Sequence, residues 1–315
     1  MRDTSTFENY KDAVVAAMID LGREHDDVVV MDADLSSCIG STAFQKEFPE
    51  RFYNVGIAEA NMAAVAGGLS SVGLTPIIHS FGCFASRRMY DQLFISVGYA
   101  HRTVHVIGSD PGITAQYNGG THMPFEDIAL MRQIPGMIIY EPSDARSLYS
   151  LMIQAYESGK SSYLRTPRKG VIHRYGEDVE IRLGKAITAR QGDDVTIVAT
   201  GAYLVDQALK AAESLAGKGV GARVIDLHTI RPLDEETILK AAKETGRMLI
   251  CENGRYAGGT GEMISAVLLK AGVPCKVDFV NVGERFGEVG SLDYLATTFG
   301  FKAENIEAKA LALVK

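Results

Sequence analysis

The chain contains 315 residues, of which 46% are hydrophobic and 23% charged, and its net charge is −7. This length suffices for two domains, and the acidic balance excludes nucleic acid as a general partner, because phosphate neutralisation requires clustered Lys and Arg. The apolar runs are too short to span a bilayer, and the N-terminal residues lack the apolar segment of a signal peptide. Four cysteines without metal-like spacing are typical of a cytoplasmic protein with reduced thiols.

Short apolar runs alternate with longer amphipathic stretches in the first half of the chain. Between residues 7 and 25, apolar side chains recur with the period of a helix, and Val28–Met31 then has the composition of a buried strand. Further strands are predicted at 51–55, 75–79, 103–107, 137–140 and 162–165, and further helices at 58–69, 90–97 and 124–133. Residues 109–121 form a glycine-rich loop. This order predicts a mostly parallel sheet with helices on both faces.

The alternation lapses between about residues 170 and 190 and then resumes. Strands are predicted at 195–199, 221–226, 248–251 and 277–280, with helices at 204–215, 234–243 and 261–270. We therefore expect an α/β protein of two doubly wound domains, residues 1–180 and 190–315, each a mostly parallel sheet with helices on both faces. In such sheets, binding and catalytic residues collect in loops at the carboxyl ends of the strands.

One carboxylate stands out in the segment Arg51–Met62. Glu59 enters a helix built almost entirely of Ala, Val, Gly and Leu, so we expect it to lie among apolar neighbours, which disfavour a charged carboxylate. An acidic residue in a first helical turn also complements the helix dipole and often has no other role. The spacing alone leaves both interpretations open.

Two further segments follow predicted strands. Phe81 and Phe84 are three residues apart, a spacing that suits either core packing or an aromatic slot for a flat heterocycle. His122 follows the glycine-rich loop, where it could be a structural hydrogen-bonding residue or a group that recognises hydroxyls and transfers protons. Asp34 ends the run Asp32-Ala33-Asp34, where it could simply cap a strand end.

Several motifs, in order, resemble the transketolase family. Val55–Met62 is similar to its catalytic-glutamate segment, His79–Gln92 to its aromatic segment, and Thr121–Arg132 to its "THQPIE" segment. Ser162–Gly170 is similar to the arginine-containing end of the first domain. In the second half, 225–234, 252–262 and 285–290 resemble segments of the family's C-terminal domain, which is structural and interfacial rather than catalytic. The resemblance covers nearly the whole chain.

The resemblance implies a role for each matched residue. Glu59 would hydrogen-bond the aminopyrimidine ring of thiamine diphosphate and, with His122, form the catalytic set. The aromatic rings of Phe81 and Phe84 would contact that ring, with Asp34 and Ile57 also at the cofactor. The substrate-binding residues would be Arg168, whose guanidinium suits a phosphate, together with Asn118 and Asp110. Asn118 and Asp110 depart from the family pattern, which usually has Asp and His there, so an unusual substrate is an open alternative.

The diphosphate domain of the family, with its GDG…N metal signature, has no counterpart in this sequence. The resemblance therefore implies that this chain holds no metal itself and that Mg²⁺ is bound by a partner, an N-terminal transketolase subunit, in an α2β2 assembly. The expected reaction is transfer of a two-carbon ketol unit between sugar phosphates. Alternatives are an enzyme like 1-deoxyxylulose-5-phosphate synthase, the β subunit of a 2-oxo acid dehydrogenase E1, and an inert regulatory or assembly subunit.

Overall fold

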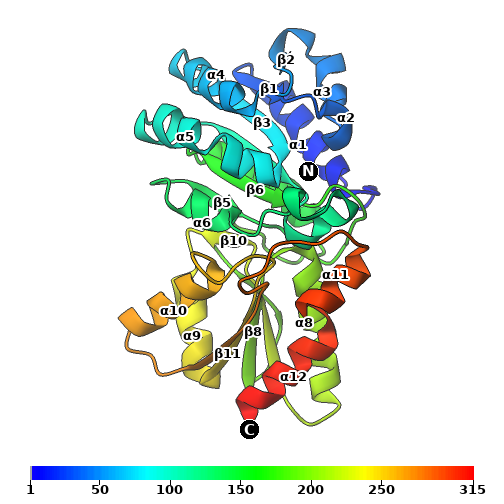
Figure 1. The fold of residues 1–315 in the computed structure, drawn as a ribbon, viewed down its shortest axis with the longest axis vertical. Helices are drawn as coiled ribbons and strands as arrows, with labels where there is room; N and C mark the ends of the chain where they lie inside the picture. The colour runs from blue at the N-terminus through cyan, green and yellow to red at the C-terminus, as the bar shows by residue number, and fades with distance from the viewer. Residues whose placement is uncertain (1) are drawn as a thin grey trace. The chain divides into compact units, whose positions relative to one another are not determined.

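The computed structural model describes residues 2–315, and these divide into two compact units (Figure 1). The first unit contains the residues up to Pro111 and Leu130–Leu183, and the second contains Gly112–Ala129 and Gly184–Lys315. Met1, the first residue of the N-terminal segment considered above, lies outside the described residues. The domain ranges 1–180 and 190–315 remain a prediction, from which the compact units differ by assigning 112–129 to the second unit.

The first unit is built on a parallel sheet with the strand order β5-β6-β4-β3-β1-β2. Its strands are β1 (Val28–Asp32), β2 (Phe52–Asn54), β3 (Thr75–Phe81), β4 (His105–Ser109), β5 (Ile138–Tyr140) and β6 (Ser162–Thr166). Every residue of β1, β4 and β6 is buried. Burial on both faces is expected for central strands of a parallel sheet, because helices cover each side.

The helices in the first half of the chain are α1 (Tyr10–Glu24), α2 (Ser36–Ile39), α3 (Thr42–Glu47), α4 (Glu59–Ser71), α5 (Tyr90–Gln92), α6 (Asp127–Arg132) and α7 (Ala145–Glu157). Helix α7, which was not predicted from the sequence, is capped by Asp144, whose carboxylate accepts a hydrogen bond from the Ser147 N–H at 2.8 Å. Such a cap satisfies an amide that would otherwise lack a partner.

Short 3₁₀ and π-helical segments interrupt these elements. They are η1 (Pro49–Arg51), η2 (Phe84–Arg88), η3 (Leu93–Tyr99), η4 (Gly112–Asn118) and η5 (Gly120–His122), of which η2 and η3 are π-helical. The predicted helix over 90–97 is therefore α-helical only in α5, and the residues from Leu93 onward belong to the π-helical η3. π-helical turns are rare and are concentrated at functional sites.

The second unit contains a sheet with the order β12-β11-β8-β9-β7, in which β7 alone is antiparallel to its neighbour. The strands of this sheet are β7 (Ile187–Arg190), β8 (Val195–Ala199), β9 (Ala222–Asp226), β11 (Arg247–Cys251) and β12 (Lys276–Val280), and β10 (Thr229–Arg231) lies outside it. Its helices are α8 (Gly201–Ala216), α9 (Glu235–Thr245), α10 (Thr260–Lys270), α11 (Leu292–Phe299) and α12 (Ala303–Val314). Figure 1 shows α8 and α12 on one side of β8 and β11, and α9 and α10 on the other.

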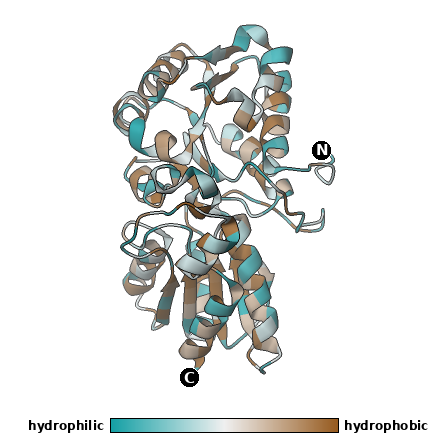
Figure 2. Cartoon of the chain, turned by 45° about the vertical axis from the view of Figure 1, so that its right-hand side comes forward, coloured by the Kyte–Doolittle hydropathy of each residue, from teal (hydrophilic) through white to brown (hydrophobic). Residues whose placement is uncertain are grey.

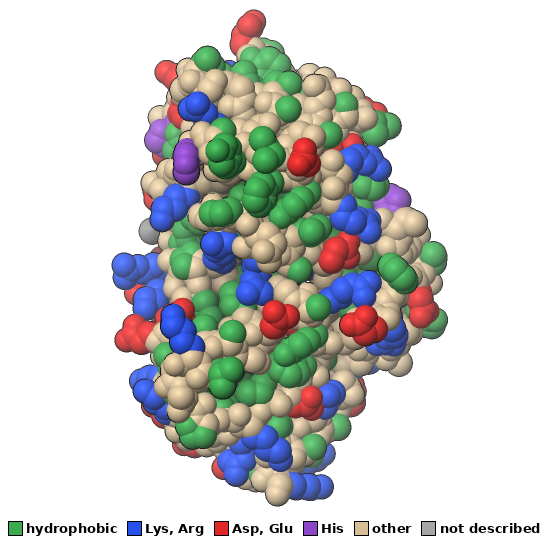
Figure 3. All heavy atoms as spheres, turned by 60° about the vertical axis from the view of Figure 1, so that its left-hand side comes forward, with side chains coloured by type: hydrophobic (Ala, Val, Ile, Leu, Met, Phe, Trp, Pro, Cys, Tyr) green, Lys and Arg blue, Asp and Glu red, His purple; other side chains and the backbone are tan. Residues whose placement is uncertain are grey.

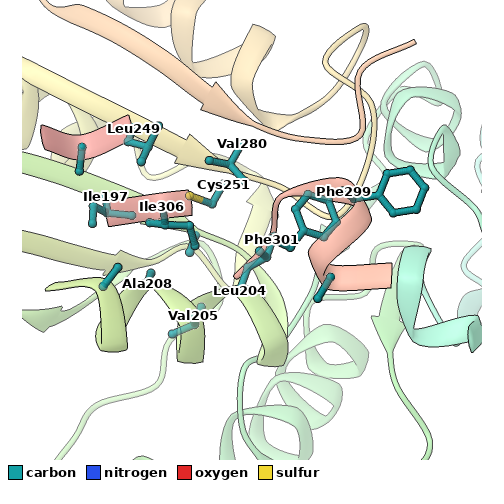
Figure 4. Close-up of a cluster of buried hydrophobic side chains, with 14 of the residues drawn as sticks. Ile197, Leu204, Val205, Ala208, Leu249, Cys251, Val280, Phe299, Phe301 and Ile306 are labelled. Carbon is teal, nitrogen blue, oxygen red and sulfur yellow. The ribbon is translucent and has the colours of Figure 1, made fainter. Parts of the chain in front are cut away.

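Two apolar layers hold this unit together, one on each face of its sheet. On the α8 and α12 side, Figure 4 shows Ile197 and Leu249 of the strands near Val205 of α8 and Ile306 of α12, all fully buried. Figure 2 shows the matching hydropathy pattern, with apolar strands between helices that are apolar on one side only. The predicted α/β fold of two mostly parallel sheets with helices is confirmed.

Candidate active site

Glu59 is the first residue of α4 and is almost completely buried, with 2% of its side chain exposed. The turn before the helix passes through Gly56, whose φ of 72° favours glycine. Both carboxylate oxygens of Glu59 accept hydrogen bonds from Arg88 Nη1, at 3.0 and 3.1 Å. We expected apolar neighbours around Glu59, and the structure adds a guanidinium from η2 that compensates the buried charge.

Phe81 and Phe84 lie at the carboxyl end of β3 and in the following π-helical turn. Their ring centroids are 6.3 Å apart, with an interplanar angle of 50°. The Arg88 guanidinium lies over Phe84 at 4.1 Å, and the Arg168 guanidinium lies over Phe81 at 5.0 Å. Each of these two phenyl rings therefore has a guanidinium on one face, at a distance where the cation and the ring attract each other.

Asp110 and Arg168 form an ion pair within the same unit. Arg168 Nη2 and Nε lie 2.6 and 2.8 Å from Asp110 Oδ2. Their side chains are 8% and 14% exposed for Asp110 and Arg168, respectively. Asp110 adopts a φ of 56°, which turns the chain sharply after β4. The acidic residue that departs from the family pattern thus neutralises the arginine predicted to bind the substrate anion.

A hollow of about 500 Å³ opens beside this pair. It is lined by Asn9, Lys11, Ser37, Cys38, Arg168 and Lys169. Three of these side chains are cations, so the hollow suits an anionic group even though one of the cations is already paired. The lysines were not singled out from the sequence, because 158 residues of chain separate Lys11 from Lys169.

Asp34 and Ile57, the other two predicted cofactor residues, are exposed. Ile57 is 77% exposed, in the turn that leads into α4. Asp34 follows β1 with a φ of 65°, and its N–H donates to Asn54 Oδ1 at 3.1 Å. Asn54 also accepts from the Gly56 N–H at 3.0 Å, so one amide side chain ties the Asp34 turn to the turn before Glu59.

A buried polar network beneath these turns was missed by our sequence analysis. His79 Nδ1 lies 2.9 Å from Asp32 Oδ2, and His79 Nε2 lies 3.0 Å from Ser109 Oγ. The three side chains are at most 1% exposed and come from the adjacent strands β1, β3 and β4. Asp32 also accepts hydrogen bonds from the Leu35 N–H and the Ser41 hydroxyl. The network fixes the strand ends that lead to Asp34, Phe81 and Asp110.

A second buried pair joins the ends of β5 and β6. Arg165 Nη1 donates to Glu141 Oε2 at 2.7 Å, and both side chains are almost inaccessible to solvent. Arg165 is the first arginine of the segment that also supplies Arg168. Its burial distinguishes the two: Arg165 braces the sheet, whereas Arg168 borders the hollow.

His122 and Asn118 belong to the second unit, in the segment 112–129. His122 is half-buried at the end of η5, and its Nδ1 lies 2.9 Å from Thr121 Oγ1. Asn118 is exposed at the end of η4. The structure thus gathers Glu59, Phe81, Phe84, Asp110 and Arg168 in one unit, and it supports His122 and Asn118 on the other.

Within residues 2–315, no group of three or more His, Cys, Asp or Glu side chains could hold a metal ion. The same residues include no helix with both the length and the apolar character needed to cross a membrane.

Comparisons with known proteins identify both halves of the chain. The family model described as transketolase, pyrimidine binding domain matches residues 8–172, and that described as transketolase, C-terminal domain matches residues 184–306. The chain therefore belongs to the transketolase family, and its relatives there include a transketolase subunit and a protein described as a putative transketolase C-terminal section.

One such relative is the 6-deoxy-6-sulfo-D-fructose transketolase subunit SqwH of Clostridium sp. strain MSTE9, which is 44% identical over 94% of this chain and 91% of its own length. A solved structure described as a split gene transketolase, inactive beta4 tetramer, is 35% identical with a TM-score of 0.89, covering 98% of this chain and all 100% of its own. The 1-deoxy-D-xylulose-5-phosphate synthase of Heliobacterium modesticaldum is 34% identical over 94% of this chain, but the match spans only 46% of that protein.

Proposed function

We propose that this chain is the catalytic C-terminal subunit of a thiamine-diphosphate-dependent transketolase, which transfers a two-carbon ketol unit only when an N-terminal subunit is bound. The observation that carries the proposal is the buried Glu59 carboxylate, which Arg88 links to the Phe84 ring, in a chain that matches the pyrimidine-binding domain of the family. An inert assembly subunit would need neither a buried carboxylate at a helix start nor the paired rings.

These residues fit the aminopyrimidine end of the cofactor. A buried carboxyl group can share its proton with a ring nitrogen, and two phenyl rings provide contact area for a flat heterocycle. Thiamine diphosphate, when bound, supplies the carbon nucleophile that carries the ketol unit. Asp34 and Ile57 would lie at the edge of the cofactor.

Arg88 has a specific part in this proposal. It neutralises Glu59 in the chain alone, and its side chain is 47% exposed, so it can move into solvent without leaving a buried cation. A ring nitrogen would then take its place as the hydrogen-bonding partner of Glu59.

The substrate would be a ketose with a terminal anionic group, seated in the hollow beside Arg168. Lys11, Arg168 and Lys169 would attract that group, while Asp110 would repel it. A phosphate carries nearly two negative charges at neutral pH and a sulfonate carries one, so Asp110 weakens the binding of a phosphate about twice as much as that of a sulfonate. The Clostridium relative, named for a sulfonated fructose, supports a sulfonate as the anionic group. His122 and Asn118 would contact the sugar hydroxyls.

The diphosphate and Mg²⁺ would be held by the N-terminal subunit, in an α2β2 assembly in the cytoplasm. The related structure described as an inactive beta4 tetramer supports the need for a partner, since there the β subunits assemble by themselves. Exposed apolar side chains support contacts with another chain. Figure 3 shows apolar residues gathered on the side that carries α4 and α5, where Val65, Ile95 and Tyr99 are 40%, 51% and 78% exposed.

The test is to purify the chain with the N-terminal subunit and to measure ketol transfer to an aldose phosphate in the presence of thiamine diphosphate and Mg²⁺. Donors would be 6-deoxy-6-sulfofructose, fructose 6-phosphate and uncharged fructose. We expect transfer by the complex, none by either subunit alone, and the highest kcat/KM with the sulfonated sugar. Turnover by the isolated chain would contradict the split-subunit proposal.

A second activity is included in the same experiment because of the similarity to 1-deoxy-D-xylulose-5-phosphate synthase. The complex would be supplied with pyruvate and glyceraldehyde 3-phosphate. Condensation of these two compounds without ketol transfer would replace our proposal with a synthase. Oxidative decarboxylation of a 2-oxo acid would instead indicate an E1 β subunit.

The role of Glu59 is tested separately with the Glu59→Gln variant. In the complex, this variant should exchange the cofactor C2 proton far more slowly than wild type, and unchanged exchange would show that Glu59 does not activate the cofactor.

A further inference from the structure

The segment that carries His122 is part of the hydrophobic core of the second unit. Ile113, Ala115, Met123 and Phe125 are buried in the same cluster as β8, α8 and the C-terminal helices. Phe125 packs edge-on against Phe299 of α11, with ring centroids 5.5 Å apart. A segment within the range matched by the pyrimidine-binding domain is therefore held in place by the core of the second unit.

Asn253, directly after β11, anchors the start of this segment. Its Oδ1 accepts a hydrogen bond from the Ile113 N–H at 3.1 Å. The Asn253 side chain also fills the space at Gly112, where an added Cβ would lie 2.1 Å from Asn253 Oδ1. At the other end, the Arg255 N–H donates to the Phe125 carbonyl at 2.8 Å. The turn after β11 therefore binds the segment on both sides of His122.

Gly287 supports the segment closest to His122. An added Cβ at Gly287 would lie 2.9 Å from the Gly120 Cα, and an added Cβ at Gly120 would lie 2.3 Å from the Gly287 carbonyl oxygen. Gly120 begins the 3₁₀ turn that ends at His122. The two backbones touch because neither residue has a side chain, so the position of Gly287 determines the position of this turn.

We propose that Asn253 and Gly287 are positioning residues, which set the place of the His122 turn and thereby the recognition of the donor sugar. This inference rests on the proposed function, because it takes His122 to contact that sugar. It gives a part in the reaction to the C-terminal domain, which the sequence predicts to be structural and interfacial. Positioning matters because a shift of about 1 Å at a reacting group can cost on the order of a hundredfold in rate.

The experiment compares Gly287→Ala and Asn253→Ala with wild type in the complex with the N-terminal subunit. Gly217→Ala is the matched control, since Gly217 belongs to the same unit, has an ordinary helical φ of −61° and ends α8. Asn253→Asp retains the acceptor oxygen for the Ile113 N–H and serves as the conservative variant. Donor kcat and KM, exchange of the cofactor C2 proton, and hydrogen–deuterium exchange of residues 112–129 in the isolated chain are measured for each.

We expect both alanine variants to lower kcat/KM for the donor at least about tenfold, with C2-proton exchange within twofold of wild type because Glu59 lies in the other unit. Amides of 112–129 should exchange faster, and Asn253→Asp should recover most of the loss. If Gly287→Ala does not fold, the result for Asn253→Ala alone tests the inference.

Wild-type kcat/KM in a folded Asn253→Ala variant would overturn the inference while leaving the proposed function intact. A fall in C2-proton exchange parallel to the fall in transfer would also overturn it, because the damage would then be general. A wild-type complex that exchanges the proton but transfers no ketol unit would refute the proposed function and, with it, this inference.

Discussion

Replacing Asp110 with Asn tests how the protein distinguishes anionic substrates. The Asp110 carboxylate is 8% exposed and binds Arg168 through two hydrogen bonds of 2.6 and 2.8 Å to one oxygen. Asn retains the size and one acceptor oxygen but removes the charge. The guanidinium is then free to attract an anionic group in the neighbouring hollow.

The magnitude follows from Coulomb's law. An anion on the open side of the guanidinium would lie about 6 Å from the carboxylate, where an effective dielectric constant of about 20 gives roughly 3 kcal/mol of repulsion per unit charge. Solvent in the open hollow reduces this to about 1 kcal/mol. Asp110→Asn should therefore lower KM about fivefold for a singly charged sulfonated ketose and on the order of twentyfold for a phosphorylated one.

The assay is ketol transfer by the complex with the sulfonated, phosphorylated and uncharged donors. The KM for uncharged fructose serves as the control and should not change. Thermal unfolding checks that the buried arginine has not destabilised the variant. An equal change in KM for all three donors, or a higher KM for the phosphorylated donor, would refute the electrostatic explanation.

Three further predictions concern the stability of the fold and the reactivity of the thiols. Burial lowers the pKa of His105 to about 4, below the ordinary value of about 6.5, so the unfolded chain binds more protons between these pH values and stability falls as the pH decreases through them. Urea titrations at pH 7.0, 5.5 and 4.5 measure how far the free energy of unfolding falls with pH. This fall should be smaller in His105→Leu than in wild type, by up to about 3 kcal/mol, and equal falls in the two proteins would contradict the prediction. His79→Leu should cost about 3 kcal/mol, because the buried Asp32 carboxylate loses its imidazole partner. Adding Asp32→Asn should restore part of that loss in the same titration, and an additive double variant would argue against the network. Cys38 and Cys275 should react with a thiol reagent at pH 8 in the native chain, whereas Cys83, whose pKa burial raises to about 11, and Cys251 should react only after unfolding.

The sequence predicts the regular elements well where composition alone determines them. The strand expected at Val195–Ala199 has the same bounds in the structure, because a run of β-branched residues covered on both faces has no competing conformation. The π-helical turns around α5 were not predicted, since they keep a helical composition and change only the hydrogen-bonding partner. Helices α11 and α12 were missed because they follow a long irregular stretch, and their burial depends on contact with α8 and β11.

The candidate site residues stay a prediction, and the contacts that the sequence did not indicate share one cause. Glu59 and both phenylalanines were singled out because their local segments resemble those of the family. The partners of the charged residues were not found: Arg88 is 29 residues from Glu59, and Arg168 is 58 residues from Asp110. Such pairs depend on which strands lie next to each other, and a single sequence does not contain that information. The three-residue network around His79 was missed for the same reason.

The route of the chain through the two units has a consequence for dividing the protein into fragments. The chain passes from one unit to the other after Pro111, after Ala129 and after Leu183. A fragment that starts at Gly184 would lack Ile113, Ala115, Met123 and Phe125, four buried side chains of its own core. The other fragment, which ends at Leu183, would carry these four side chains without the cluster that buries them. An expression boundary at residue 183 would therefore separate four core side chains from the cluster that buries them, and a covalently joined copy of 112–129 would restore these contacts in the second piece.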